Sequence, residues 1–446
     1  MGTVSIFFFF FNVNNIICRV FCYLHPFWVY SVRKHCPWGP EDYWPSSLCR
    51  ECHGKIYEQY EQSWHAKAFD NPVFKAQYFK EVVPLAFKDS ALLEEAKGCI
   101  GCHAPIAYLK TRGHVISDAQ VNQEISGVTC DFCHTIRGYS GKSPGNYNYI
   151  SIPGTTKLGP FKIKTNWHRK YSELHTQSEF CAVCHNAVNH HGIEIKATYT
   201  EWKESRYAED GIQCQDCHMN MQGFLTAGMA LYESGQAARM ELVDVSYRSK
   251  IYTHRFPGAH SGAQVTGALT IIIEPEKLYA SPGETITINI FIDNSRTGHK
   301  RPSGSADLRF LWLDVKAIAE EGNISILAAD GDENDVAGKR ASDQDISEND
   351  IPRGSRIYRA IYVDKTGKQT LSSYDAEKII FDNRLNAAEV RKETFHFTVP
   401  YETNGSVSLV AKLNYLPYPS SFSKRLEVPE PKNIEIASCS KKIIIE

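Results

Sequence analysis

Apolar and polar residues alternate with period two through the C-terminal part of the chain, from Gln264 onward. Every second residue from 286 to 292 is isoleucine, and a similar alternation covers 407–415. In a β-strand successive side chains point to opposite faces, so this pattern predicts strands with one buried face. Further strands are predicted at 308–318, 355–363, 378–381 and 393–399. Many strands without a helical period indicate an all-β immunoglobulin-like sandwich domain over residues 263–446.

Residues 41–262 have a different organisation, in which short stretches of helical composition are joined by long loops. The predicted helices cover 57–69, 91–96, 169–178 and 198–208. A chain of 446 residues is long enough for two or three domains. We therefore expect a mostly irregular and α-helical domain at 41–262, followed by the β-sandwich domain.

The overall composition is that of a globular protein, with 42% hydrophobic and 22% charged residues. It excludes the collagen-like, coiled-coil and disordered classes. The net charge of −2 provides no basic footprint, so we expect no nucleic-acid partner. The unusual feature is the content of fourteen cysteines and seventeen histidines, which must carry the chemistry.

Ten of the fourteen cysteines lie in five copies of the pentapeptide Cys-x-x-Cys-His, the pattern of c-type haem attachment. Two thiols at this spacing can each add to one vinyl group of a single porphyrin, forming two thioethers. The histidine that follows then lies under the iron as its proximal ligand. The sequence thus predicts five haem c groups. The five copies are Cys49-Arg-Glu-Cys52-His53, Cys99-Ile-Gly-Cys102-His103, Cys130-Asp-Phe-Cys133-His134, Cys181-Ala-Val-Cys184-His185 and Cys214-Gln-Asp-Cys217-His218.

Three other uses of paired cysteines fit this pattern less well. Structural zinc needs two converging pairs and does not require an adjoining histidine in every copy. A thioredoxin-like dithiol would occur once, near a βαβ pattern. A disulfide framework would not space its cysteines so regularly.

Ten further histidines outside the motifs and the N-terminal segment are enough to give every iron a second imidazole. Bis-histidine haem has no open position for a substrate and suits electron transfer. His65 lies in a stretch of helical composition, and a helix can hold an imidazole rigidly against a porphyrin face. His299 lies in a loop bounded by glycine and proline, which can direct one imidazole from the β domain toward a neighbouring haem.

The remaining predicted second ligands come from two short segments. His254 and His260 bracket a loop containing Pro257 and Gly258, and they could serve two different haems. One of His168 and His175, which precede the fourth motif, is also expected to bind iron, with His175 favoured. The weaker candidates are His114, His190, His191, His396 and the methionines between Met219 and Met240.

Residues 1–40 form a leader or hydrophobic segment, because 1–30 are rich in Phe, Ile and Val with Arg19 as the only charged side chain. A secretory leader would normally have a basic start and a small-residue cleavage site, which this segment lacks. As a membrane anchor, its flanking Arg33 and Lys34 would favour a cytoplasmic location for the following chain. Covalent haem attachment takes place outside the cytoplasmic membrane, so we expect export to the periplasm, cell surface or extracellular space. Membrane association is left open.

With these motifs in place, the chain resembles the multihaem c-type cytochromes, in particular the tetrahaem family that relays electrons from hydroxylamine oxidation and its longer relatives with a β domain. The similarity starts at the first motif and continues through Tyr57, Tyr60 and Ser63-Trp64-His65-Ala66. It includes Gly127-Val128-Thr129, Glu201-Trp202-Lys203 and Gly298-His299-Lys300. The resemblance implies haem-to-haem electron relay, with His65 and His299 as distal ligands. A fifth motif departs from the tetrahaem pattern.

The function expected is electron transfer through five bis-histidine haems, without catalysis. Redox partner proteins are the expected partners, and the resemblance adds self-assembly into extracellular conducting filaments. The alternative is a multihaem oxidoreductase that acts on small nitrogen or sulfur compounds at one five-coordinate haem. A third hypothesis is a binding module in which the β domain docks a surface or partner. An all-low-spin spectrum would favour the first over the second.

Overall fold

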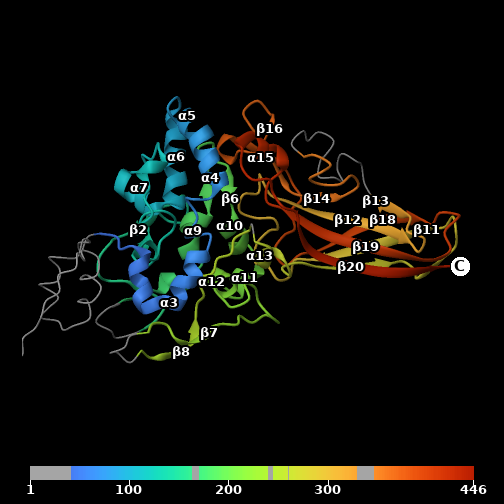
Figure 1. Cartoon of the computed structure of the whole chain (residues 1–446), viewed down its shortest axis with the longest axis horizontal. Helices are drawn as coiled ribbons and strands as arrows, with labels where there is room; N and C mark the ends of the chain where they lie inside the picture. The colour runs from blue at the N-terminus through green and yellow to red at the C-terminus, as the bar shows by residue number, and fades with distance from the viewer. Residues whose placement is uncertain (1–41, 163–169, 240–244, 260, 329–345) are drawn as a thin grey trace, which may run out of the picture.

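The computed structural model describes residues 42–162, 170–239, 245–259, 261–328 and 346–446. The predicted leader at 1–40 and the candidate ligands His168 and His260 lie outside these residues. A helical part, built from the first half of the chain, lies beside a part with long strands that ends at the C-terminus (Figure 1). Within the described ranges, no helix has the length and apolar character needed to cross a membrane.

The helical part contains many short helices and small two-stranded sheets. Its helices are α3 (Ser46–Gln62), α4 (Pro72–Gln77), the π-helix η1 (Tyr78–Val82), α5 (Val83–Ala86), α6 (Ser90–His103), α7 (Pro105–Thr111), the 3₁₀-helix η2 (Asp118–Gln120), α8 (Cys130–Cys133), the 3₁₀-helix η3 (Glu173–Thr176), α9 (Glu179–His185), α10 (Thr198–Lys203), α11 (Arg206–Glu209) and α12 (Cys214–His218). Its strand pairs are β1 (Ile136–Tyr139) with β2 (Tyr149–Ser151), β3 (Leu158–Gly159) with β4 (Lys170–Tyr171), β5 (Ala187–Val188) with β6 (Glu194–Lys196), and β7 (Glu233–Gln236) with β8 (Tyr247–Ile251).

Local side chains set several helix starts. Asp89 accepts hydrogen bonds from the backbone of the first turn of α6, and Asn71 does the same before α4, where Pro72 occupies the first helical position. The prediction at 91–96 is confirmed within α6, and that at 198–208 resolves into α10 and α11.

Two helix predictions need correction. The stretch 57–69 begins inside α3, but the helix ends at Gln62 and turns follow, so His65 lies beyond the helix. Between Lys170 and Thr176 the chain forms β4 and η3 in place of the predicted α-helix. Pairing of β4 with β3 supplies the backbone partners there, and tertiary pairing outweighs local composition.

The strand-rich part has strands in every predicted range, but the range 355–363 divides into two short strands that belong to different sheets. It contains α13 (Gly262–Val265), β9 (Thr270–Pro275), β10 (Tyr279–Ala280), β11 (Thr285–Asp293), β12 (Phe310–Ala319), β13 (Ile324–Leu327), β14 (Arg356–Tyr358), β15 (Ala360–Val363), β16 (Gln369–Thr370), the 3₁₀-helix η5 (Ser373–Asp375), β17 (Lys378–Asp382), β18 (Val390–Thr398), β19 (Gly405–Leu416), α15 (Ser420–Leu426) and β20 (Ile434–Ile445). The helix α15 was not anticipated.

Three sheets organise this part. The six-stranded sheet has the order β10-β20-β19-β12-β13, with β14 also paired to β12. The three-stranded sheet β18-β11-β9 is antiparallel, and a second three-stranded sheet has the order β16-β15-β17. The chain therefore combines a helical part with a strand-rich part of several sheets, while the immunoglobulin-like sandwich stays a prediction.

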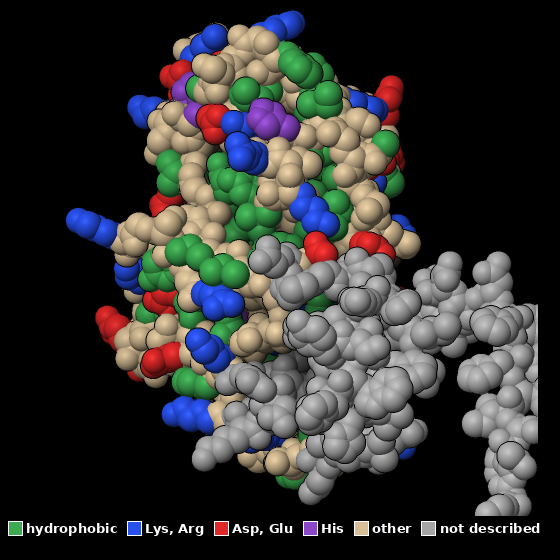
Figure 2. All heavy atoms as spheres, turned by 90° about the vertical axis from the view of Figure 1, so that its left-hand side faces the viewer, with side chains coloured by type: hydrophobic (Ala, Val, Ile, Leu, Met, Phe, Trp, Pro, Cys, Tyr) green, Lys and Arg blue, Asp and Glu red, His purple; other side chains and the backbone are tan. Residues whose placement is uncertain are grey.

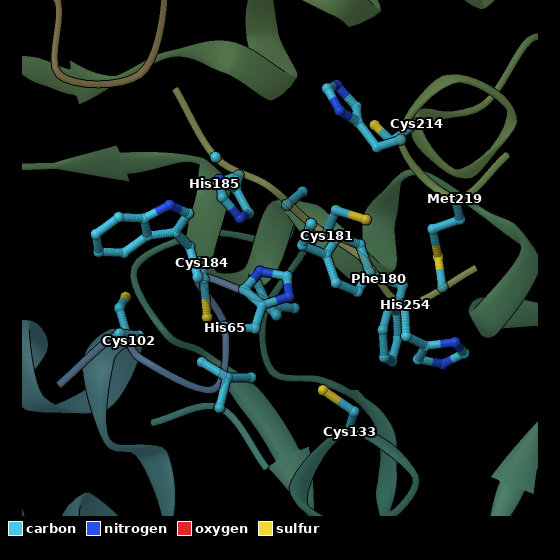
Figure 3. Close-up of a pocket in the computed structure, with 18 of the residues that line it drawn as sticks. His65, Cys102, Cys133, Phe180, Cys181, Cys184, His185, Cys214, Met219 and His254 are labelled. Atoms are coloured by element: carbon cyan, nitrogen blue, oxygen red, sulfur yellow. The ribbon is translucent and has the colours of Figure 1, made fainter. Parts of the chain in front are cut away.

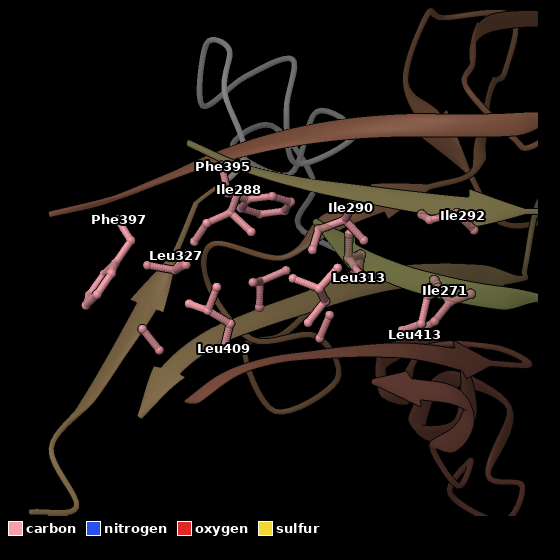
Figure 4. Packing of buried hydrophobic residues seen from close by; sticks show 14 of the residues in the cluster. Ile271, Ile288, Ile290, Ile292, Leu313, Leu327, Phe395, Phe397, Leu409 and Leu413 are labelled. Atoms are coloured by element: carbon pink, nitrogen blue, oxygen red, sulfur yellow. The ribbon is translucent and has the colours of Figure 1, made fainter. Parts of the chain in front are cut away.

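The alternating isoleucines of β11 form the centre of the β core. Ile286, Ile288, Ile290 and Ile292 are fully buried, with 0% exposure. They share one cluster with Leu313 of β12 and with leucines of β19, so the six-stranded sheet and the sheet β18-β11-β9 bury a common apolar layer (Figure 4).

The helical and strand-rich parts are in direct contact. Val73 and Ala76 of α4 pack against the cluster that contains Trp312 and Phe422. The Lys80 ammonium donates to the Leu426 carbonyl over 2.8 Å. These contacts hold the strand-rich part against the helical part, next to the site described below.

Candidate haem-binding site

All five Cys-x-x-Cys-His motifs line one cavity, whose wall also includes residues of the strand-rich part such as His299. The cavity has a volume of about 2480 Å³, and every motif cysteine and histidine contributes to its wall. Pockets for a single small molecule have volumes of about 300–1,000 Å³, so this space suits several large groups. Figure 3 shows cysteines of four motifs around the same space, with His65, His185 and His254 between them.

Each motif adopts a turn of helix, which explains the spacing of its residues. The motifs lie within α3, at the ends of α6 and α9, and in the short helices α8 and α12. Residues three apart on a helix share one face, so the two thiols of each motif project together. Thr129 caps α8 by accepting from the Phe132 backbone, which fixes the third motif in this form.

Thiols of different motifs lie close together within the cavity. Cys130 lies close enough to Cys49 to raise the pKa of the Cys49 thiol, and Cys102 and Cys214 do the same for Cys184 and Cys181. These pairs relate the first motif to the third, the second to the fourth, and the fourth to the fifth. Attachment points for neighbouring groups therefore lie side by side.

Three imidazole pairs face each other across the cavity at nearly the same separation. The ring centres are 6.2 Å apart for His65 and His185, 6.2 Å for His218 and His299, and 6.3 Å for His134 and His254. Two imidazoles bound to one metal ion at about 2.0 Å each have ring centres about 6 Å apart. Each pair thus joins a motif histidine to a second histidine at the spacing that a shared iron requires.

His175 is a second candidate at the third motif. Its ring centre lies 5.8 Å from that of His134, but its Nε2 is 3.1 Å from the carbonyl oxygen of Cys133. The Nδ1 atom of His175 is buried and has no hydrogen-bond partner. In contrast, His254 uses Nδ1 toward the Tyr252 carbonyl, which leaves Nε2 for a metal. Each histidine therefore keeps one ring nitrogen for a metal, Nδ1 in His175 and Nε2 in His254, and both stay candidates as the partner of His134.

Backbone carbonyls orient most of the motif imidazoles in the same way. Nδ1 of His53, His103 and His134 lies 2.8, 2.8 and 2.6 Å from a carbonyl oxygen. Nδ1 of His299 makes the same contact over 2.9 Å. A carbonyl only accepts, so Nδ1 carries the proton and Nε2 keeps the free lone pair that a metal needs.

Burial keeps most of the candidate imidazoles neutral. It lowers the pKa of His65, His218 and His254 to about 3, with smaller contributions from neighbouring imidazoles. It also lowers the pKa of His103 and His299 to about 4. His185 has free surface, but that surface lies inside the cavity, and burial lowers its pKa as well. Neutral imidazole is the form that binds a metal.

His65 is positioned by backbone contacts on both sides. The Trp64 N–H donates to the Phe256 carbonyl over 3.0 Å, and the Val128 N–H donates to the His65 carbonyl over 2.8 Å. Gly127 has φ of 69°, and a Cβ there would clash with the Ala66 carbonyl oxygen. The glycine is therefore required for this close approach of two segments.

The other histidines lie in varied surroundings. His190 lines the cavity, and its Nδ1 is 2.5 Å from a Glu95 carboxylate oxygen, while the His191 ring lies 3.8 Å from the His190 ring. His114 and His396 are exposed, as expected for His396 from its place in a strand. Phe74 stacks on His103 with ring centres 3.8 Å apart. Met219 also lines the cavity.

Sequence reasoning missed a set of basic side chains on the cavity wall, Lys196, Arg301 and Arg309. Burial lowers the pKa of Arg301 to about 10. The only sequence signal is that Arg301 stands two residues after His299.

The residues present fit covalently bound haem. Paired thiols on helical turns, neutral imidazoles with a free Nε2, and facing imidazole pairs are what c-type haem requires. Across the described part of the chain, no group of three or more Cys, His, Asp or Glu side chains is gathered as a metal site made of protein ligands alone.

The class of protein follows from these features together with a family match. Residues 48–135 match the model of the family "Cytochrome c554 and c-prime". This match covers the first three motifs and the predicted ligand His65. The motifs, the cavity and the match support a multihaem c-type cytochrome that binds haem c.

A more particular similarity comes from a solved structure, the penta-heme cytochrome c552 from Thermochromatium tepidum. Its TM-score is 0.63 at 19% identity, covering 91% of this chain and 100% of that chain. The likeness shows the fold, and its coverage extends over both the helical and the strand-rich parts. The sporulation control protein Spo0M from Bacillus subtilis has a TM-score of 0.16 at 13% identity, covering 40% of this chain and 50% of that chain, and carries no argument. No curated protein gives a significant sequence match.

Proposed function

We propose that this protein transfers electrons through five covalently attached haem c groups with bis-histidine ligation. The observation that carries the proposal is the set of three facing imidazole pairs, with ring centres 6.2 to 6.3 Å apart. Haem iron, when bound, supplies one-electron redox chemistry. The chain's own residues fix the attachment points, hold the imidazoles neutral and exclude water from their surroundings.

The proximity of the motif thiols supports a relay rather than isolated redox sites. Thiols of the first and third motifs lie close enough for one to raise the pKa of the other, as do those of the second and fourth motifs and of the fourth and fifth. Cys133 of the third motif also lies close enough to Cys184 to raise its pKa, after the larger effects of Cys102 and burial. The five attachment sites therefore form one connected set, which suits stepwise electron transfer.

The strand-rich part belongs to the proposed relay because it supplies His299 to the fifth motif. We propose that the strand-rich part is an immunoglobulin-like sandwich, since its six-stranded sheet and the sheet β18-β11-β9 share one buried layer. Export from the cytoplasm follows from the chemistry of haem attachment. Redox partner proteins and assembly into filaments are part of the same proposal, with electron microscopy at low concentration as the test of assembly.

One face of the helical part bears on partner docking. Figure 2 shows acidic and basic side chains interspersed with hydrophobic ones on the visible surface of this face. Such a mixed surface gives no large single-sign field for steering a partner. We therefore propose docking through local complementarity.

Electron paramagnetic resonance of the oxidised full-length protein, followed by carbon monoxide addition to the reduced protein, tests the function. A relay gives only low-spin ferric signals and no carbon monoxide binding. A high-spin signal, or binding of nitrite or carbon monoxide at one haem, would support the alternative of an oxidoreductase. The second motif is where we would look for such a haem, because none of the three facing imidazole pairs includes His103.

A further inference from the structure

Three basic side chains converge on the cavity near the fourth and fifth motifs. Lys196 comes from β6, and Arg301 and Arg309 come from the segment that leads into β12. All three side chains line the same cavity as His185 and His218. After the larger effect of burial, the charges of Arg309 and Lys196 help to lower the pKa of His185, and the charge of Arg301 helps to lower that of His218.

The charges of this cluster are not balanced by protein carboxylates. Lys196 donates to Ser305 Oγ over 3.1 Å, and Arg309 donates to the Ser303 carbonyl oxygen, which are both neutral acceptors. Within the described residues no ion pair involves any of the three cations. The nearby carboxyl of Asp307 is buried, and burial raises its pKa, while the charges of Lys196 and Arg309 act in the opposite direction. Its Oδ1 has no hydrogen-bond partner. The cluster therefore has three positively charged side chains and at most one negatively charged side chain.

A neighbouring cluster shows how the same fold treats other buried ions. Arg384 pairs with Glu201 over 2.8 Å and with Asp382 over 2.9 Å, and Lys300 pairs with Asp382 over 2.9 Å. In that cluster the two positive side chains are therefore balanced by two carboxylates. Because burying unpaired charge is costly, the excess at Lys196, Arg301 and Arg309 indicates that an anion from outside the polypeptide completes this cluster.

We propose that Lys196, Arg301 and Arg309 form an anion site for propionate carboxylates of the haem groups attached at the fourth and fifth motifs. This inference rests on the proposed function. Guanidinium groups present a planar fork of donors that matches a carboxylate. Two of the three cations come from the strand-rich part, so that part contributes counter-charge as well as His299 to the site.

The consequence is a change in redox potential, because positive charge near a haem favours its ferrous form. The test is a spectroelectrochemical titration of the full-length holoprotein carrying Arg309→Gln, with Arg309→Lys as the charge-conserving variant. For a guanidinium about 12 Å from the iron, Coulomb's law with an effective dielectric of about 20 gives an increase of about tenfold in the ratio of oxidised to reduced haem when the charge is removed. For a one-electron couple, tenfold is a shift of about 59 mV to lower potential. Lys412→Gln, at the exposed ion pair between Lys412 of β19 and Glu435 of β20, is the matched control.

We expect one or two haems to shift in Arg309→Gln and to return toward the original potential in Arg309→Lys. Potentials equal to those of the control would overturn the inference. If Arg309→Gln fails to fold, Lys196→Gln gives the same test at a side chain that donates a hydrogen bond to the hydroxyl of Ser305.

A soluble anion is the other source of negative charge, and titration of the holoprotein with inorganic phosphate and with nitrite distinguishes it. If haem propionates occupy the site, neither phosphate nor nitrite should show saturable binding that depends on Arg309. Saturable binding that is lost in Arg309→Gln would overturn the assignment to propionates. Absence of covalent haem would refute the proposed function itself, whereas unshifted potentials in a haem-loaded protein would refute only the anion site.

Discussion

Replacement of His65 by alanine tests the assignment of second ligands most sharply. His65 faces His185 of the fourth motif at 6.2 Å, and its ring packs against Phe256 with centres 4.3 Å apart. His65→Ala removes the second imidazole at one of five motifs and leaves the thiols and His185 in place. We therefore expect about one-fifth of the haem to change from low-spin to high-spin, because loss of the sixth ligand opens one coordination position.

Electron paramagnetic resonance measures the high-spin fraction, and a carbon monoxide titration counts the open sites, for which we expect one per chain. His65→Met restores a ligand of a different kind and is expected to return the low-spin state with a raised potential. The matched control is His396→Ala, because His396 is exposed on β18. Unchanged spin states and no carbon monoxide binding in His65→Ala would refute the pairing of His65 with the fourth motif.

Three further outcomes are expected. Gly127→Ala should displace the His65 segment and raise the high-spin fraction in the same assay. The control Gly138→Ala, where an added Cβ meets no atom within 4 Å, should leave the spectrum unchanged, and equal spectra for the two variants would contradict the positioning role of Gly127. Ile290→Ala, at 0% exposure in the β core, should lower the free energy of unfolding by about 2–5 kcal/mol in a urea titration followed by circular dichroism, and a loss under about 1 kcal/mol would argue against the shared layer. Glu201→Gln removes one carboxylate partner of the buried Arg384 and should lower the free energy of unfolding by about 3–5 kcal/mol, whereas Lys412→Gln at an exposed pair should lower it by about 0–1 kcal/mol. Equal losses would contradict the conclusion that buried charges in this fold need balancing partners.

The attachment sites could be predicted from sequence because their chemistry is local. Two thiols and an imidazole within five residues need only one turn of helix to come together, and every motif forms such a turn. The strands were predictable for a similar reason, since the alternation at 286–292 has only one regular structure that buries it on one face.

Second ligands were harder to predict because their partners are distant in sequence. His65 and His299 could be proposed from their local surroundings, yet His65 pairs with the fourth motif and His299 with the fifth only through the tertiary fold. Prediction of a helix over His175 failed because pairing of β3 with β4 organises the preceding backbone. Lys196, Arg301 and Arg309 carry no motif, and their meeting depends on contact between the helical and strand-rich parts.

Covalent attachment of five haems is measured by the intact mass of the mature protein, combined with a pyridine haemochrome assay. The mass should exceed that of the polypeptide by five haem groups, and the assay should find five haems per chain. A mature protein with fewer additions, or one whose haem is released without breaking thioether bonds, would contradict this prediction.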